Sequence, residues 1–428
     1  MNMITRRAGL AMAGLATLAR PSLPRAQGNA PLAVFSHRVH QTVATGADGG
    51  DATAPFTRQT GAPAQWTTFD IGPLWDRLQR EASLSEGSVD VGFVLNTQVT
   101  PRAATLFEPL DEWMRRDPVE APDDIFPGLL EGFRVGGAGI AMPVRHSSSG
   151  LHYNAEIFEK RGIAGPPRTI EELAEVARRC TYRDGGPPVV GLVIPGVAYP
   201  NVIDIARAWD GDFVTADFRC VADQPPMVNA IRLLRELFEA GAFPRNFATL
   251  QAEDVNTWMQ TGRAAMALTG MSRNRIYNDP QRGRFAGKIR TVAVPVSESL
   301  KDRFDVAPAK VEFWGMAIPR NARRKDLSWA FIKTLLTRQA TLGMALGGNG
   351  PVRASTYEDA RLKEAVSYAD EERRVLRVAR VPLPAFDEAA RAGDLFREEA
   401  EAAVLGMRTP EEAMRSLTAR VAPLLPKV

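Results

Sequence analysis

The stretch from residue 32 to residue 95 contains, in order, LAVFSH (32–37), DATAPFTRQTG (51–61), PAQWTTF (63–69), IGPLWDRLQREAS (71–83) and VDVGFVL (89–95). Short apolar runs alternate here with segments whose apolar residues recur at helical spacing, which is a β–α–β–α–β pattern. Strands that alternate with amphipathic helices favour a mainly parallel sheet with helices on both faces. The sequence therefore predicts an α/β fold.

A second unit of the same kind follows further along the chain. In PPRTIEELAEVARRC (166–180), Thr169 and Glu172 have the spacing of a capping box, which predicts a helix that begins at about Ile170. The later segments predicted as helices or strands are VVGLVI (189–194), MVNAIRLLRELFEAG (227–241), RTVAVPV (290–296), FWGMAI (313–318) and TPEEAMRSLTARVAPLL (409–425). We expect two lobes with a small-molecule cleft between them.

Each predicted lobe consists of two stretches of the chain. The N-terminal lobe is expected to contain residues 28–144 and about 286–345, and the C-terminal lobe about 145–285 and about 346–428. A chain of about 400 residues exceeds what a single hydrophobic core usually holds. Each lobe is predicted to be a mainly parallel sheet that is flanked by helices.

The first 27 residues are typical of an export signal. Arg6 and Arg7 precede an uncharged run at residues 10–19, which is too short to span a bilayer as a helix. The paired arginines fit both the twin-arginine and the ordinary secretory route, and both stay open. Because neither cysteine lies near the expected cleavage region, we expect a free periplasmic protein after cleavage of the signal.

The export signal also accounts for the positive charge of the chain. The 53 Lys and Arg residues stand against 50 Asp and Glu residues, and four of the arginines lie in residues 1–27, which leaves 49 basic residues in the remainder. A nearly neutral remainder gives nucleic-acid binding no support. Cys180 and Cys220 are the only cysteines, and a disulfide and two separate thiols are both open.

The sequence patterns of well-specified catalytic sites are absent. The chain has no GxSxG, P-loop, HExxH or CxxC sequence. The enzyme class that stays open is a glycoside hydrolase, because two carboxylates at a suitable separation are enough for that chemistry. We predict that the protein is not an enzyme, and we predict no catalytic residue and no cofactor.

Polar residues follow two of the predicted strands, at residues 36–40 and 96–98, where ligands bind in open α/β sheets. The first group contains His37 and His40, and the other two histidines, His146 and His152, lie where the first unit passes into the second. Residues three apart on a strand face opposite sides, so His37 and His40 converge on a metal only if the chain turns there. We predict hydrogen bonds from one or two of these rings to a ligand, and no metal site.

Residues 139–179 carry the most specific pattern, GIAMPVRHSSSGLHYNAEIFEKRGIAGPPRTIEELAEVARR. This segment resembles the crossover of carbohydrate-type, family 1 extracellular solute-binding proteins of ABC importers. The matching positions are Pro143, Tyr153, Asn154, Phe158, Gly162, Pro167, Thr169 and Leu173. Further matches, in order, are ATAPFTRQTG (52–61), ARAWDGDFV (206–214), TGRAAMALTGM (261–271), FWGMAIPRNARRKDLSWAFIKTLL (313–336) and GMRTPEEAM (406–414). The resemblance therefore covers nearly the whole chain after the export signal.

The resemblance implies a periplasmic-binding-protein fold, whose two lobes close around a small polar solute like a hinged trap. It implies a sugar or sugar-like solute and delivery to the permease subunits of an ABC transporter. A non-sugar anionic solute is the alternative. We expect a monomer that binds no nucleic acid and has no stable membrane insertion.

Carried over position by position, the resemblance gives a set of candidate ligand-binding residues. They are His37, Arg38, Asn96, Thr97, Gln98, His146, Ser147, Trp209, Ser272, Arg273, Trp314 and Arg353. Relatives often have an aromatic residue after ALTG, where this chain continues with Met271, so Trp209 or Trp314 is the expected stacking platform. Several of these candidates are cationic, which favours an acidic or phosphorylated ligand. A neutral saccharide is the other ligand class that stays open.

Overall fold

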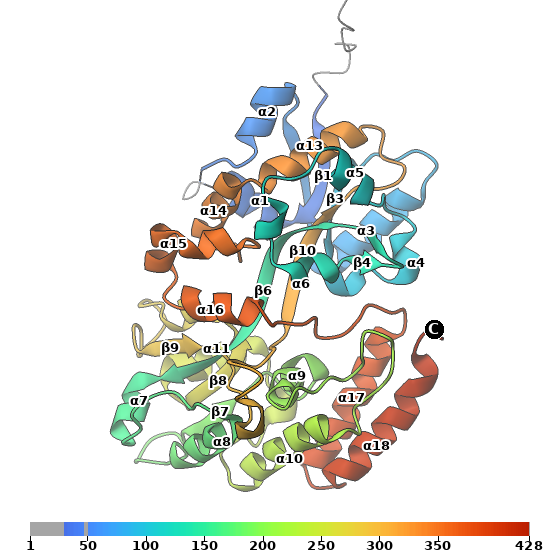
Figure 1. Ribbon diagram of the computed structural model, residues 1–428. Coiled ribbons are helices and arrows are strands. Elements are labelled where there is room, and N and C mark those ends of the chain that lie inside the picture. Colours follow the sequence, from blue (N-terminus) through green and yellow to red (C-terminus); the bar gives the residue numbers. More distant parts are fainter. Residues whose placement is uncertain (1–29, 47–49, 428) are drawn as a thin grey trace, which may run out of the picture.

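The computed structural model describes residues 30–46 and 50–427, so the predicted export signal at residues 1–27 lies outside the described residues. Figure 1 shows two lobes, one above the other, with strands β6 (Met142–Asn154) and β10 (Val311–Ala317) running from one lobe into the other. The predicted two-lobed α/β fold is confirmed.

The long strands of both lobes form one continuous sheet in the order β2-β1-β3-β10-β6-β8-β7, with β9 also paired to β6. In the first lobe β1, β2 and β3 are parallel and β10 runs against them, and in the second lobe β7, β8 and β9 run against β6. The other strands are β1 (Leu32–His37), β2 (Ala64–Phe69), β3 (Val91–Leu95), β4 (Arg134–Val135), β5 (Ala138–Gly139), β7 (Val190–Val193), β8 (Ala264–Gly270) and β9 (Ile289–Val292).

The helices cover the sheet on both sides. Those of the first lobe are α1 (Arg38–Thr45), α2 (Ala54–Thr60), α3 (Ile71–Ser83), α4 (Pro101–Ala104), α5 (Asp111–Arg116), α6 (Pro127–Glu131), α13 (Lys325–Leu335), α14 (Arg338–Leu346) and α15 (Ala360–Ala365). Those of the second lobe are α7 (Ala155–Lys160), α8 (Ile170–Arg179), α9 (Tyr199–Arg207), α10 (Pro225–Glu239), α11 (Ala252–Thr261), α12 (Arg273–Tyr277), α17 (Ala389–Val404) and α18 (Pro410–Val421). Helix α16 (Ala369–Leu376) lies at the junction. Within the described residues, no helix is both long enough and apolar enough to cross a membrane.

The predicted β–α–β–α–β unit of residues 32–95 is confirmed. Strand β1 pairs with β2 from Leu32 opposite Ala64 and with β3 through Val34 opposite Val91, and both ladders are parallel. The side chains of Leu32 and Val34 are fully buried because alternate residues of the strand face the core. Residues 38–60 form two helices, α1 and α2, between β1 and β2.

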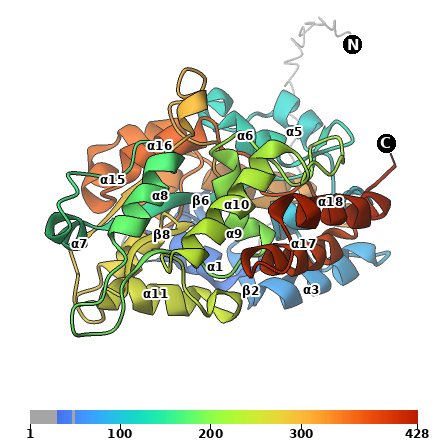
Figure 2. The ribbon, with the colours of Figure 1, turned by 90° about the horizontal axis from the view of Figure 1, so that it is seen from below.

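Helix α8 of the second lobe begins at Ile170, as predicted. The Thr169 hydroxyl accepts a hydrogen bond from the Glu172 backbone N–H at 3.1 Å, which caps the helix. The Glu172 carboxylate accepts from the Arg168 N–H at 2.7 Å, so the second bond of the capping box is displaced by one residue. In Figure 2, α8 and α10 lie on one side of β8 and α11 on the other, which gives this lobe its two helical layers.

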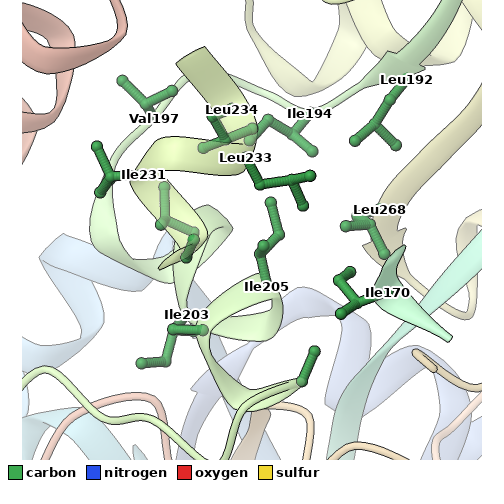
Figure 3. Packing of buried hydrophobic residues seen from close by; sticks show 14 of the residues in the cluster. Ile170, Leu192, Ile194, Val197, Ile203, Ile205, Ile231, Leu233, Leu234 and Leu268 are labelled. Carbon is green, nitrogen blue, oxygen red and sulfur yellow. The ribbon is translucent and has the colours of Figure 1, made fainter. Parts of the chain in front are cut away.

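The core of the second lobe is built from aliphatic side chains on α8, α9, α10 and the strands. Figure 3 shows Ile203 and Ile205 of α9 beside Ile231 and Leu234 of α10, with Leu192 and other side chains of the sheet on the far side. All five side chains are fully buried. At about 25 cal/mol per Å² of apolar surface, such burial is the main stabilising contribution to each lobe.

The buried residues divide between the lobes differently from the predicted boundaries at two places. Residues of the segment 289–309, including Val294 and Ala307, pack in the second core, because β9 pairs with the second half of β6. Val352, Tyr357 and Leu362 pack in the first core instead of the second. The boundaries near residues 286 and 346 stay a prediction.

Three segments of chain cross between the lobes. The first half of β6 pairs with β10 in the first lobe, and its second half pairs with β8 and β9 in the second. The third crossing segment, residues 377–385, follows α16. It is joined to the start of β10 because the Val311 N–H donates to the Arg380 carbonyl at 3.0 Å and the Arg380 N–H donates to the Ala309 carbonyl at 3.3 Å. The hinge of the molecule therefore consists of three neighbouring extended segments.

Candidate ligand-binding cleft

The carboxyl ends of the parallel strands of both lobes meet at the hinge. In the first lobe β3 ends at Leu95, which lies opposite Trp314 of β10. In the second lobe β8 ends at Gly270, which lies opposite Ser149 in the middle of β6. Because ligands of open α/β sheets bind beyond these strand ends, the space between them is the candidate cleft.

The paired strands β6 and β10 divide the junction into two sides. Trp314 lies opposite Arg145, and Glu312 opposite Ser147, so these four side chains share one face of the ribbon, here called the front face. Phe313 and its partner His146 belong to the other face, the rear face. The residues that close the carboxyl end of β1 lie beside Trp314, which places the candidate cleft on the front face.

Trp314 and two histidines form an aromatic group at the front face. The His37 ring lies 6.5 Å from the Trp314 ring, centroid to centroid and nearly parallel to it, and the His40 ring lies 4.8 Å away at a steep angle. His40 also stacks on Phe93 at 4.7 Å, and the two histidine rings are 6.1 Å apart. The rings approach each other because α1 begins at Arg38, so the chain turns directly after the strand.

The rear face holds a large cavity of about 600 Å³, which residues of both lobes and of the third crossing segment line. Gly132 lines it next to Phe313, since a Cβ at this glycine would lie 2.2 Å from the Phe313 Cζ. Three of the charged groups on its wall are paired with one another, since Asp212 lies 2.8 Å from Arg207 and 3.2 Å from Arg380. Because these groups are engaged within the protein, the cavity is a weaker candidate than the front face.

The model of the family described as "Bacterial extracellular solute-binding protein" matches residues 51–341, which is well over half of the chain. This chain belongs to that family of bacterial extracellular solute-binding proteins. The description of the family is that of binding proteins.

Two curated relatives and one solved structure illustrate the similarity. A "Probable ABC transporter-binding protein" of Deinococcus radiodurans is 25% identical over 255 residues, 57% of this chain and 58% of that protein. A "Mannitol-binding protein" of Pseudomonas aeruginosa is 23% identical over 270 residues, 57% of each chain. The sugar-binding protein MalE from Xanthomonas citri has a TM-score of 0.79 and 19% identity over 92% of this chain and 97% of that one. The matched region spans somewhat more than half the length of the two curated relatives, and the likeness to MalE shows the fold.

Several of the predicted ligand-binding residues of this binding protein lie at the front face. His37 is half-buried, and its Nδ1 accepts a hydrogen bond from the Val39 N–H at 3.3 Å, which caps α1. Burial lowers the pKa of His37, although Asp70 acts in the opposite direction. Arg38 is exposed beside it. The His37 ring is therefore neutral near pH 7 and free to donate through Nε2.

Two hydroxyls from different lobes also reach the junction. Ser147 of β6 and Ser272, which follows β8, are exposed, and both line a small cavity of about 60 Å³ with Arg145 and Gly350. A Cβ at Gly270 would lie 3.2 Å from the Ser147 hydroxyl, so the end of β8 lies directly against β6. These serines remain predicted ligand contacts.

The three residues that follow β3 have local roles. The Asn96 side chain is buried, and its Oδ1 accepts a hydrogen bond from the Phe313 N–H at 3.0 Å, which links β10 to the end of β3. The Gln98 side chain accepts from the Leu95 N–H at 3.1 Å and caps a single helical turn. Thr97 is half-buried. We predicted ligand contacts at all three, and the bonds of Asn96 and Gln98 are already made within the protein.

His146 belongs to a buried hydrogen-bond network on the rear face. Its Nε2 lies 2.9 Å from the Tyr357 hydroxyl, which donates to Glu372 at 2.9 Å, and the same carboxylate accepts from Ser148 at 2.8 Å. Burial, with the nearby charge of Arg145, lowers the pKa of His146 to about 3. The ring is buried between β6 and the segment that leads to α16, and its Nε2 is already hydrogen-bonded, so the predicted ligand contact through this atom stays a prediction.

Arg353 was predicted to contact the ligand, and the structure contradicts this. The side chain is fully buried in the first lobe. Its guanidinium donates to the carbonyls of Leu336, Ala121 and Glu120, and it lies 3.3 Å from the Asp124 carboxylate. All of its donors are used by the protein, so the group holds three loops together.

Two further candidates also have partners within the second lobe. Trp209 follows α9 and packs against the core of that lobe, and it lines neither cavity at the junction. Arg273 begins α12 and pairs with Glu253 of α11 at 3.4 Å. Trp314 is therefore the tryptophan that the structure brings to the front face, of the two that the sequence left open.

The remaining questions on metals and cysteines have clear answers within the described residues. In residues 30–46 and 50–427 no three His, Cys, Asp or Glu side chains are grouped so as to hold a metal ion. Cys180 and Cys220 are separate thiols, so the disulfide alternative is wrong. Cys180 is buried at the end of α8, and the Cys220 thiol lies 3.8 Å from the Thr418 hydroxyl.

Two residues of the front face were missed by the sequence analysis. Arg145 of β6 lies opposite Trp314 of β10. Glu312 lies two residues before Trp314 on β10. The sequence could have indicated Arg145, because side chains alternate along a strand and Arg145 therefore lies on the same side of β6 as the predicted contact Ser147. What the sequence did not give is the register that sets β6 against β10.

Acid is expected to destabilise this binding protein through its buried histidines. Burial lowers the pKa of His152 to about 4 and that of His146 to about 3, from an ordinary value of 6.5. Both rings are therefore neutral when folded and take up protons on unfolding, so their contribution to stability is complete above about pH 6.5 and is lost as the pH falls toward 4. We expect the free energy of unfolding to fall by about 1.4 kcal/mol per pH unit for each ring.

Urea unfolding between pH 4 and 7 measures this slope. The Nδ1 of His152 lies 2.7 Å from the Thr291 hydroxyl, so His152→Asn keeps a polar partner for that group without a titrating ring. The variant should be less stable at pH 7 and should show a shallower slope than the wild type. An unchanged slope would contradict the assignment of the acid lability to His152.

Proposed function

We propose that this protein captures a sugar or sugar-like solute between its lobes in the periplasm and delivers it to the permease of an ABC transporter. The observation that carries the proposal is the front face of the hinge, where Trp314 lies beside the neutral His37 and on the same face of the ribbon as Ser147. Sugars and polyols present apolar C–H faces together with hydroxyls in several directions. An aromatic platform ringed by short polar side chains complements both features.

The named relatives support the same class of solute. One relative is a mannitol-binding protein, and the structurally similar MalE is a sugar-binding protein. The transporter partner is supported by the first relative, whose description is that of an ABC transporter-binding protein. Export, cleavage of the signal and a monomeric state complete the proposal, and the export-type sequence of residues 1–27 supports the first two.

The hinge supplies a physical reason for trapping. A solute that touches groups of both lobes favours the arrangement in which the lobes are close, and it shifts the population by the difference between its affinities for the two arrangements. Closure also removes water from the hydrogen bonds between solute and protein. Three adjacent crossing segments allow rotation of one lobe against the other without breaking either core.

Calorimetric titration with D-mannitol, D-glucose and maltose tests the proposal, together with the variant Trp314→Ala. We expect at least one of these solutes to bind, and Trp314→Ala to weaken its binding by about 10-fold or more, because an aromatic contact is lost. The matched control is Trp209→Phe, which should leave the affinity unchanged because Trp209 packs in the second lobe. Absence of binding for neutral and acidic saccharides alike, or turnover of a glycoside, would overturn the proposal.

A further inference from the structure

Arg145 stands out among the arginines at the junction because it lacks a partner. Its Nη1 atom is buried without a hydrogen bond to any of the described residues, and no described carboxylate forms an ion pair with it. Arg145 as a whole is half-buried, and the two fully buried arginines at the lobes are neutralised, Arg207 by Asp212 and Arg353 by Asp124. The cation at position 145 is therefore uncompensated in the protein without solute.

None of the described acidic groups around Arg145 forms an ion pair with it. Glu372 lines the same small cavity, but its carboxylate accepts hydrogen bonds from Ser148 and Tyr357, and burial raises its pKa. His37, His40 and His146 all face its charge, and burial keeps the pKa of each ring below its ordinary value, so the rings are neutral. Asp70 faces His37. Glu312 lies on the same face of the ribbon but forms no ion pair with Arg145. Burial also lowers the pKa of Arg145 itself.

An unpaired buried cation is costly, because the loss of hydration is not offset by a counter-charge. Such a group is expected where a ligand supplies the missing anion. Arg145 is placed for that role, since it lies opposite Trp314 on the front face and lines the small cavity together with Ser147 and Ser272. A solute that lies against Trp314 reaches the guanidinium without crossing the ribbon.

We propose that the solute is a sugar acid, a polyhydroxylated carboxylate whose hydroxylated chain lies against Trp314 and whose carboxylate binds the Arg145 guanidinium. This inference rests on the proposed function and narrows its solute class. The guanidinium of Arg145, with neutral histidine rings around it, matches the planar, two-oxygen geometry of a carboxylate.

The cation that would hold an acidic ligand in the structure differs from the set that the sequence suggested. The sequence suggested His37, Arg38, His146, Arg273 and Arg353 as the cationic set. In the structure Arg353 and Arg273 already have carboxylate partners, and both His37 and His146 are neutral near pH 7. Arg38 stays exposed beside His37, whereas the cation with a buried, unpaired nitrogen is Arg145, which the sequence analysis did not select.

Calorimetry with matched neutral and acidic solutes tests the inference. The pairs are D-mannitol with D-mannonate and D-galactose with D-galacturonate, and galactose 1-phosphate is the phosphorylated probe. We expect the acid of at least one pair to bind about 10-fold or more tightly than its neutral partner. Arg145→Gln should weaken binding of that acid by about 30-fold and change binding of the neutral partner by less than about 3-fold.

The control is Arg178→Gln, which removes an exposed arginine of α8 that pairs with Glu236. A second variant, Arg145→Met, separates recognition from structure. Removal of an unpaired buried charge should keep or raise the melting temperature without solute, whereas removal of a structural arginine would lower it. The variant should still lose the preference for the acid.

The possible outcomes separate failure of the inference from failure of the proposed function. Binding of a neutral solute with no preference for its acid, or an acid affinity that Arg145→Gln leaves unchanged, would overturn the inference and leave the proposed function in place. Tighter binding of the phosphate ester than of the carboxylates would overturn the carboxylate assignment. Binding of none of the probes would overturn the proposed function and the inference with it.

Discussion

Replacing Arg207 with methionine is expected to lower the free energy of unfolding by about 3–5 kcal/mol. The guanidinium is almost completely buried at the end of α9, with 2% of the side chain exposed. It donates to Asp212 and to the carbonyls of Pro308, Arg380 and Val381. Methionine fills similar volume but leaves the carbonyls and the carboxylate without their donor, and unpaired buried acceptors are costly.

The position of these carbonyls makes the loss of Arg207 a defect of the hinge as well. Pro308 leads into β10, and Arg380 and Val381 lie in the third crossing segment, so one side chain of the second lobe holds two of the three crossings. We therefore expect weaker solute binding in addition to lower stability, because the orientation of the lobes is less well fixed. Urea unfolding and calorimetry on the same sample measure both effects.

An exposed arginine provides the control for Arg207. Arg219 pairs with Asp217 at 2.7 Å on the surface of the same lobe, where an ion pair contributes little. Arg219→Met should change the free energy of unfolding by less than about 0.5 kcal/mol. If Arg207→Met is as mild as this control, the guanidinium does not hold the crossings.

Replacing Gly191 with alanine is expected to destabilise the second lobe by about 3 kcal/mol, or to prevent its folding. The added Cβ would lie 1.9 Å from the carbonyl oxygen of Ala177 and 2.4 Å from the Ala177 carbonyl carbon. Both contacts are to the backbone of α8, so no side-chain rotation relieves them. Helix α8 would have to move away from β7, and the contacts of Ile170 and Leu192 in the same core would loosen.

Circular dichroism during thermal unfolding, with the yield of soluble protein, measures the effect of this change. Gly186→Ala is the matched control, because Gly186 is exposed and a Cβ there would meet nothing within 4 Å. We expect the control to melt within about 1 °C of the wild type. If the melting temperature of Gly191→Ala equals that of Gly186→Ala, then α8 moves away from β7 at little cost in stability, which contradicts the prediction.

The elements that the sequence predicted well are those with strong local signals. Residues 32–95 alternate apolar runs with amphipathic segments, and this pattern is repeated in the strands and helices of the first lobe. The start of α8 at Ile170 and the complete capping box of α18 at Thr409 depend on contacts over three residues. Such contacts do not need the rest of the fold.

The sequence was less informative wherever the outcome depends on packing between distant segments. Tyr357, for example, packs in the core of the first lobe and forms a hydrogen bond with His146, which lies 211 positions away in the sequence. The two cysteines are both compatible with a disulfide by composition, and only the structure separates them. Long-range contacts of this kind have no local signature.

By itself, then, the sequence determined the two-lobed α/β class and the elements with strong local patterns, because periodicity and capping are local properties, and a family resemblance placed the crossover between the lobes within residues 139–179. The tertiary structure decided which polar residues of the hinge are free to meet a solute. The side chains of Arg353 and His146 form hydrogen bonds with buried groups of the protein, whereas the Nη1 atom of Arg145 is buried without a partner. The physical reason is register and burial. The pairing of β6 with β10 sets the side of the ribbon on which each side chain lies, and the desolvation of each charge depends on what packs against it.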